Sequence, residues 1–309
     1  MGPVANVVAA RGGRRRRIAG VFQVWIESVL PAPLTGPVEV TKEVPWSMVA
    51  VVPTERGRFW FKENRAGTRY EAGLIAALGA WAPDRVLVPV AVESARGWSL
   101  LPDGGPTLRV TDTTPSVAHW EQMLADHAAF QRTLTGQVEA LLALGVPDVR
   151  PAAILSQVDR LPVPPEYVET LRELCRRLDA NPIPASLQHD DLHDANVFAT
   201  GRVFDWGDAS VAHPFGVLLI SLRVATDRFG VRAGDPVLAR LRDAYLEPWS
   251  DLADRASLIA EVEAAVQVTK VSRALSWERS LVGADGAALA EYGPNVQGWL
   301  DELLEPNDL

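Results

Sequence analysis

Cysteine is nearly absent from this chain, since Cys175 is the only one among 309 residues. A disulfide within the chain is therefore excluded, and a reducing, cytoplasmic environment fits the composition. Long apolar runs are also missing, so no membrane association is expected. No repeat or low-complexity tract is visible, and 48% hydrophobic with 22% charged residues is typical of an ordinary globular protein.

Glycine-rich phosphate loops are the second absence. The first half contains no G-x-G-x-x-G, and no G-x-x-x-x-G-K-[ST] occurs anywhere. Any phosphate held by this chain must therefore be held by other groups.

The two signs of charge are unevenly distributed along the chain. Residues 1–110 carry 14 basic and 9 acidic side chains, whereas the remainder carries 16 basic and 30 acidic ones. A basic half suits a polyphosphate and an acidic half suits a cationic small molecule, although acidic surfaces also serve solubility. Five arginines precede residue 18, which predicts a disordered basic tail over residues 1–20. We expect no nucleic-acid partner, and an amphipathic helix around Val21–Leu30.

The most specific pattern lies between residues 189 and 208. His189, Asp191 and Asn196 follow the H-x-D-x-x-x-x-N spacing of kinase catalytic loops, and Asp205-Trp206-Gly207 follows like a D-F-G element. In phosphoryl transfer a carboxylate orients the attacking hydroxyl, and oxygen ligands hold magnesium on the triphosphate. The spacing assigns Asp191 to the first role, and Asn196 and Asp205 to the second.

Residues around this pattern predict its local geometry. A short strand over 185–188 leads into His189, which we expect to brace the loop rather than to react. Two apolar pairs, Val197-Phe198 and Val203-Phe204, flank a turn-like stretch and predict a β-hairpin. The roles of His193 and Asp194, in the second shell or on the surface, stay open.

The order of elements upstream is strand, strand, helix, strand, strand, followed by helices. The list of expected strands is Trp46–Val52, Arg58–Lys62, Val86–Val92 and Gly97–Leu101, with a helix over 68–80. After the break Pro102–Pro106 the expected helices are Val117–Leu144, Pro165–Asp179, Phe215–Arg228, Pro236–Tyr245, Leu252–Ser276 and Ala287–Leu304. This order predicts an α+β fold of two lobes, with a small β-rich lobe over residues 21–101 and a larger, mainly helical lobe over 102–309.

The small lobe supplies candidate nucleotide-binding residues. Lys62 ends an apolar strand and is the candidate for gripping phosphates, with Glu71 on the next helix as its partner. Ser47 is a candidate phosphate contact, or simply part of its strand. Leu101 precedes the break Pro102–Pro106 and Asp103 lies within it; a hinge at this break would offer backbone groups to adenine.

With these residues in view, the chain resembles the aminoglycoside phosphotransferase and choline kinase superfamily. The resemblance rests on H-x-D-L-H-x-x-N at His189–Asn196 and on Asp205-Trp206, where protein kinases carry phenylalanine instead of tryptophan. It implies a protein-kinase-like bilobal fold, ATP or GTP with Mg²⁺, and transfer of the γ-phosphoryl group to a hydroxyl of a small, cationic acceptor. The expected protein is a monomer or homodimer.

Two departures from that superfamily concern the acceptor. Many relatives have glycine in place of Asp190, and many have an aspartate in the stretch that here reads Ala212-His213-Pro214-Phe215. The candidates for binding a cationic acceptor are Asp208, Glu261 and Glu278.

Three alternatives remain open. The acceptor is an aminoglycoside or amino sugar, or else an amino alcohol of the choline and ethanolamine type. A non-catalytic nucleotide-binding regulator would share the fold. A metal-dependent phosphohydrolase would need His119, His127, His189, Asp190 and His193 to converge on a metal.

Overall fold

The computed structural model describes residues 20–158 and 163–305. Of the expected basic tail over residues 1–20, all but Gly20 lies outside this range. The described chain forms two compact units. Unit 1 holds residues 20–105, 202–207 and 279–291, and unit 2 holds residues 106–158, 163–201, 208–278 and 292–305.

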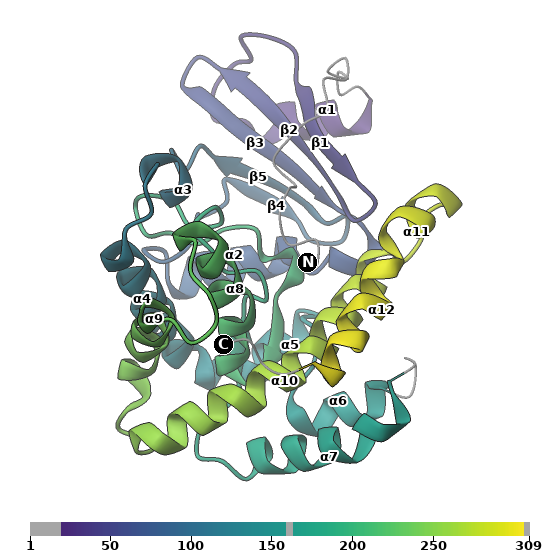
Figure 1. Ribbon diagram of the computed structural model, residues 1–309. Coiled ribbons are helices and arrows are strands. Elements are labelled where there is room, and N and C mark those ends of the chain that lie inside the picture. The colour runs from purple at the N-terminus through teal and green to yellow at the C-terminus, as the bar shows by residue number, and fades with distance from the viewer. Residues whose placement is uncertain (1–19, 159–162, 306–309) are drawn as a thin grey trace. The chain divides into compact units, whose positions relative to one another are not determined.

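Unit 1 is built on a five-stranded antiparallel sheet in the order β1-β2-β3-β5-β4 (Figure 1). Its elements are α1 (Val21–Val29), β1 (Glu39–Val44), β2 (Ser47–Thr54), β3 (Gly57–Asn64), a 3-10 turn (Ala66–Thr68), α2 (Glu71–Trp81), β4 (Ala91–Glu93), β5 (Trp98–Pro102) and α11 (Gly286–Tyr292).

The core of unit 1 follows from the alternation of side chains along its strands. Met48, Ala50 and Val52 of β2 are buried, and Phe59 and Phe61 of β3 face the same core. Because side chains alternate between the two faces of a strand, this pattern gives the sheet one apolar face. The amphipathic α1 covers that face, and its rings at Phe22 and Trp25 pack on Phe61 and Trp98. The helix expected at Val21–Leu30 is thereby confirmed.

Unit 2 is mainly helical and contains one two-stranded sheet. Its elements are α3 (Leu108–Thr111), α4 (Val117–Leu134), a 3-10 turn (Thr135–Gln137), α5 (Val138–Ala143), α6 (Pro151–Val158), α7 (Pro165–Asp179), β6 (Ser186–Gln188), β7 (Ser210–Ala212), a 3-10 turn (Pro214–Val217), α8 (Leu218–Phe229), α9 (Pro236–Leu246), a 3-10 turn (Glu247–Trp249), α10 (Arg255–Ser280), α12 (Pro294–Asp301) and a 3-10 turn (Glu302–Leu304). A further 3-10 turn, Trp206–Asp208, begins in unit 1 and ends in unit 2. The last two residues of α10 belong to unit 1, and the last residue of α11 belongs to unit 2.

Buried polar side chains fix the small sheet of unit 2 against α4. Gln131 of α4 donates from Nε2 to the carbonyl of Leu187 at 2.9 Å, and Ser186 donates to the carbonyl of Gln131 at 2.6 Å. Tyr245 of α9 donates to Gln131 Oε1 at 2.6 Å. Since buried polar groups are costly without partners, this network fixes the strand that leads into the loop over residues 189–196.

Several predicted elements differ from the observed ones. The strand expected over Val86–Val92 is reduced to β4, because Pro89 has no backbone N–H to donate to a ladder. The helix expected over Val117–Leu144 breaks at Thr135–Gln137, where Thr135-Gly136 has poor helix propensity.

The β-hairpin expected at residues 197–204 is also wrong. Gly201 closes the turn with φ of 81°, and its N–H donates to the carbonyl of Phe198 at 2.8 Å. The first arm, however, pairs with residues 106–108 in unit 2, through Phe198 and Thr107. The second arm pairs with residues 85–86 in unit 1, through Val203 and Val86. Each arm is bonded to a distant segment, which a local pattern cannot reveal.

Across the two described stretches of chain, no helix combines the length and the apolar character that crossing a bilayer requires.

Candidate functional site

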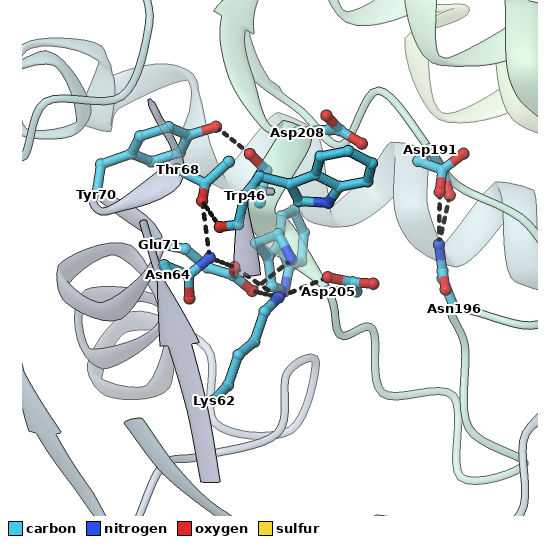
Figure 2. A network of polar contacts seen from close by, with 12 residues as sticks. Trp46, Lys62, Asn64, Thr68, Tyr70, Glu71, Asp191, Asn196, Asp205 and Asp208 are labelled. Carbon is cyan, nitrogen blue, oxygen red and sulfur yellow. Dashed lines mark hydrogen bonds and ion pairs between the residues drawn. The ribbon is translucent and has the colours of Figure 1, made fainter. Parts of the chain in front are cut away.

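In unit 1, Lys62 lies between two carboxylates (Figure 2). Its Nζ is 2.6 Å from Glu71 Oε2 and 2.6 Å from Asp205 Oδ1. Lys62 is on β3 and Glu71 is in the first turn of α2, so the predicted pairing of these two residues is present. Asp205 reaches the same cluster from the segment after the 198–201 turn.

The D-W-G segment is tied to the same carboxylate by its backbone. The N–H of Trp206 donates to Glu71 Oε1 at 3.0 Å, and the Tyr70 hydroxyl donates to the carbonyl of Gly207 at 2.6 Å. A Cβ atom at position 207 would lie 3.1 Å from Glu71 Oε2, which is tighter than an ordinary contact. Glycine at position 207 therefore allows D-W-G to approach Glu71.

The charges of this cluster hold Lys62 as an ammonium. Burial lowers the pKa of Lys62, but the charges of Asp205 and Glu71 outweigh it and raise the pKa above its usual value. Burial raises the pKa of Glu71, while Lys62 opposes that effect. Glu71 is 3% exposed and Asp205 has a 42% exposed side chain, so Asp205 is the carboxylate accessible to a ligand.

The other nucleotide-binding candidates lie on other strands of the same sheet or, for Asp103, directly after one. Ser47 begins β2 and is buried opposite Asn64. Leu101 is on β5 opposite Trp60. Asp103 pairs with Arg58 at 2.8 Å, and its Oδ1 accepts the N–H of Gly105 at 3.1 Å.

In unit 2, β6 leads directly into the loop that carries Asp191. Asn196 donates from Nδ2 to the carbonyl of Asp191 at 2.9 Å and to Asp191 Oδ2 at 3.1 Å (Figure 2). The N–H of Ala195 donates to His193 Nδ1, so a neutral His193 carries its proton on Nε2. That Nε2 is 3.6 Å from Asp191 Oδ2. His193 therefore contacts the candidate catalytic carboxylate.

Surrounding groups favour an ionised Asp191. Burial raises the pKa of Asp191, but the hydrogen bond and charge of His193, together with the charge of Arg273, lower it below its usual value. His189, in contrast, is fully buried, and its Nδ1 accepts the N–H of Asp191 at 3.3 Å. This is the bracing contact expected of His189.

Asp190 has a different environment from its neighbour. Its φ is 63°, in the left-handed region that favours glycine. Its carboxylate accepts from Gln188 on β6 and from Ser210 on β7. Burial raises the pKa of Asp190 to about 6, against the charge of Arg273 and these two hydrogen bonds.

Asp194 is a structural residue whose partners the sequence did not reveal. Its carboxylate is 2% exposed and accepts from Arg109 at 2.6 Å and from Arg228 at 2.8 Å. Arg109 is on α3 and Arg228 is in the last turn of α8. Both arginines are remote in sequence, so no local spacing indicates the contact.

The three candidates for binding a cationic acceptor have unequal surroundings. Asp208 is one-third exposed and accepts from Ser276 at 2.7 Å. Glu261 is buried on α10 and pairs with Arg177 of α7 at 3.2 Å. Glu278 is half-buried near the end of α10. The Glu261 carboxylate is thus already engaged by a guanidinium.

The histidines do not assemble a metal centre. Within the described residues, no group of three His, Cys, Asp or Glu side chains is placed to hold a metal ion. His119 pairs instead with Asp112 at 2.6 Å, and burial lowers the pKa of His127 to about 3. The phosphohydrolase alternative has no support from these positions.

Three solved structures share the fold of this chain. They are a choline/ethanolamine kinase family protein from Mesorhizobium loti (17% identity, 92% of this chain and 94% of that chain covered, TM-score 0.57), the GDP and kanamycin complex of APH(2")-IIia (17%, 91% and 98%, 0.55), and the choline kinase LicA from Streptococcus pneumoniae (13%, 91% and 98%, 0.54). At these identities the likeness establishes the fold, which confirms the predicted protein-kinase-like architecture. None of the curated proteins compared with the chain matches it.

The family model described as "Phosphotransferase enzyme family" matches residues 47–258. The match includes the Lys62 cluster and the whole loop over residues 189–196, and it covers more than half of the chain. The prediction of a phosphotransferase enzyme is thereby confirmed: the chain belongs to the phosphotransferase enzyme family.

Proposed function

We propose that this protein transfers the γ-phosphoryl group of ATP or GTP to a hydroxyl group of a small, cationic acceptor. The observation that carries the proposal is the Asp191 carboxylate, which Asn196 holds and the His193 imidazole contacts. An ionised carboxylate fixed in this way can accept or orient the proton of an attacking hydroxyl.

Unit 1 supplies the groups for the nucleotide in this proposal. The Lys62 ammonium, held by Glu71, binds phosphate oxygens. In this proposal unit 1 also contacts the nucleotide through Ser47 and through the backbone around Leu101 and Asp103. The fold relative solved with GDP supports a guanine nucleotide as one of the two donors to test.

Magnesium fits the chemistry of the donor set. Asp205 offers a carboxylate and Asn196 an amide oxygen, and hard oxygen donors of this kind are the ligands that Mg²⁺ prefers in proteins. When bound, the ion would neutralise the triphosphate charge, and the protein residues would position the reacting groups.

The acceptor class is proposed from charge. Residues 111–309 carry 30 acidic and 16 basic side chains. Two fold relatives are a kanamycin complex and a choline kinase, and both of those named molecules are cationic. Aminoglycosides, amino sugars and amino alcohols are therefore the first acceptors to test.

The test is a screen of nucleotide consumption with Mg²⁺, followed by detection of the phosphate ester by phosphorus NMR. Asp191→Ala should lower turnover by about 10³-fold, because it removes the group that orients the hydroxyl proton. Nucleotide affinity should stay within about threefold, since the proposed phosphate contacts lie on unit 1.

A matched control is available in Asp227→Ala, because Asp227 is exposed on α8 and should not affect turnover. Full activity of Asp191→Ala would refute the proposed role. Nucleotide binding without turnover of any acceptor would favour the non-catalytic regulator instead.

A further inference from the structure

The carbonyl groups of five successive catalytic-loop residues, Asp190 to Asp194, all accept hydrogen bonds. In order, the donors are Arg273 Nη1 at 3.1 Å, Asn196 Nδ2 at 2.9 Å, Ser221 Oγ at 2.8 Å, Asn196 N at 2.9 Å and Arg109 N at 2.9 Å. Asn196 belongs to the loop itself, whereas the other three donors come from separate helices. Of these three, Arg273 alone is a charged side-chain donor.

Arg273 also contacts Asp208, the residue that follows D-W-G. Its Nη1, which donates to the carbonyl of Asp190, is 3.5 Å from Asp208 Oδ2. Ser276, three residues later on the same face of α10, donates to Asp208 Oδ1 at 2.7 Å. Both oxygens of Asp208 are therefore engaged by α10.

The buried guanidinium lies among three carboxylates. Arg273 is 6% exposed, and its Cζ lies 5.8 Å from the centroid of the Trp299 ring. Burial lowers the pKa of Arg273, but Asp208, Asp191 and Asp190 outweigh that effect and raise it. Arg273 thus provides a permanent positive charge beside the catalytic loop.

The contact stabilises an unfavourable backbone conformation. Asp190 has a left-handed φ of 63°, a conformation that is uncommon for a non-glycine residue and persists where surrounding contacts impose it. The Arg273 hydrogen bond to the Asp190 carbonyl is one such contact. The same peptide unit continues into Asp191, so its orientation determines where the Asp191 carboxylate points.

We propose that Arg273 and Asp208 form a bridge that positions the catalytic loop. This rests on the proposed function, because it gives the bridge its purpose of aiming Asp191. Asp208 then serves as the anion that orients Arg273, and it is not the anchor for a cationic acceptor. Neither residue touches the reacting atoms; both act through the backbone of Asp190.

Hydrogen exchange measured by mass spectrometry tests the bridge without any acceptor. In Asp208→Asn and Arg273→Gln, amides in a peptide covering residues 186–196 should exchange at least about tenfold faster than in the wild type. A peptide covering β2 and β3 should be unchanged. The double variant should exchange no faster than the more affected single variant, because both changes break one bridge.

Arg223→Gln is the matched control. Arg223 lies over the same Trp299 ring at 4.9 Å but pairs with Glu302 rather than with the loop aspartates. In Arg223→Gln, amides of residues 186–196 should exchange as slowly as in the wild type. This result would show that the faster exchange in the bridge variants does not come from lost packing on Trp299. If Arg273→Gln does not fold, Asp208→Asn decides alone, since it removes only one partly exposed charge.

Kinetics with an acceptor found by the screen give a second readout. The bridge variants should lower kcat by about 10- to 100-fold with little change in the acceptor KM, because a misaimed carboxylate affects the chemical step. An Asp208→Asn enzyme with intact loop protection, unchanged kcat and a raised KM for a cationic acceptor would overturn the bridge. If no acceptor is turned over, the proposed function fails, and the exchange data still decide whether the bridge exists.

Discussion

At the scale of single residues, the two adjacent aspartates of the proposed catalytic loop differ in ionisation because their surroundings differ. Asp191 is held ionised by His193 and Arg273, whereas burial favours the neutral form of Asp190. The sequence singles out Asp191 by its spacing but offers no explanation for Asp190. Its positive φ explains why glycine would suit this position, and Gln188 and Ser210 explain how an aspartate is accommodated.

We predict that Asp190→Asn makes the protein less sensitive to pH. The pKa of Asp190 rises from 3.8 to about 6 on folding, so this group favours the folded state below about pH 4 and loses that contribution as pH rises through 6. The shift corresponds to about 3 kcal/mol. Asparagine can accept from Gln188, donate to Ser210 and adopt a positive φ.

Urea denaturation at pH 4.5 and pH 7.5 measures this difference. The variant should gain stability relative to the wild type at pH 7.5 and gain less at pH 4.5. The exposed Asp227→Asn serves as the control and should keep the wild-type pH dependence. If Asp190→Asn changes the free energy of unfolding by the same amount at both pH values, the raised pKa assigned to Asp190 is contradicted.

At the scale of elements, local sequence signals succeeded where the element depends on local bonds. Helix α7 has its predicted bounds, Pro165–Asp179, because a proline at its first position and a 3.6-residue pattern both act locally. The supposed hairpin at 197–204 failed because its arms bond to residues 106–108 and 85–86. Arg273 escaped notice for the same reason, since nothing near it in sequence marks its contact with the loop.

Asp194 joins the catalytic loop to α3 and α8, and we predict that Asp194→Ala destabilises unit 2. Removing a buried carboxylate leaves Arg109 and Arg228 without their shared partner. Because both arginines are partly exposed and can rehydrate, we expect a loss of about 2 kcal/mol rather than the larger cost of a fully buried pair.

Asp243→Ala is a matched control for this change. Asp243 also pairs with two arginines, Arg242 and Arg255, but its side chain is 33% exposed. It should lose less than about 1 kcal/mol in the same urea denaturation. Equal losses in the two variants would show that burial of Asp194 is not what matters.

At the scale of the whole molecule, the net charge of −9 arises entirely from residues 111–309. If these carboxylates attract a cationic acceptor, its KM should rise several-fold between about 0.05 and 0.5 M NaCl, because salt screens exposed charges. Nucleotide hydrolysis without acceptor, measured over the same salt range, controls for effects on the nucleotide. An acceptor KM that does not change over this salt range would argue against charge as the basis of acceptor choice.

The close approach of Gly207 to Glu71 has a consequence for how such chains evolve. Any side chain at position 207 would press on the Glu71 carboxylate, which also holds Lys62 and the N–H of Trp206. A descendant that gains a side chain at 207 must therefore also adjust the acid at position 71 or the contacts that this acid makes. These two positions, far apart in the chain, are expected to vary as a pair.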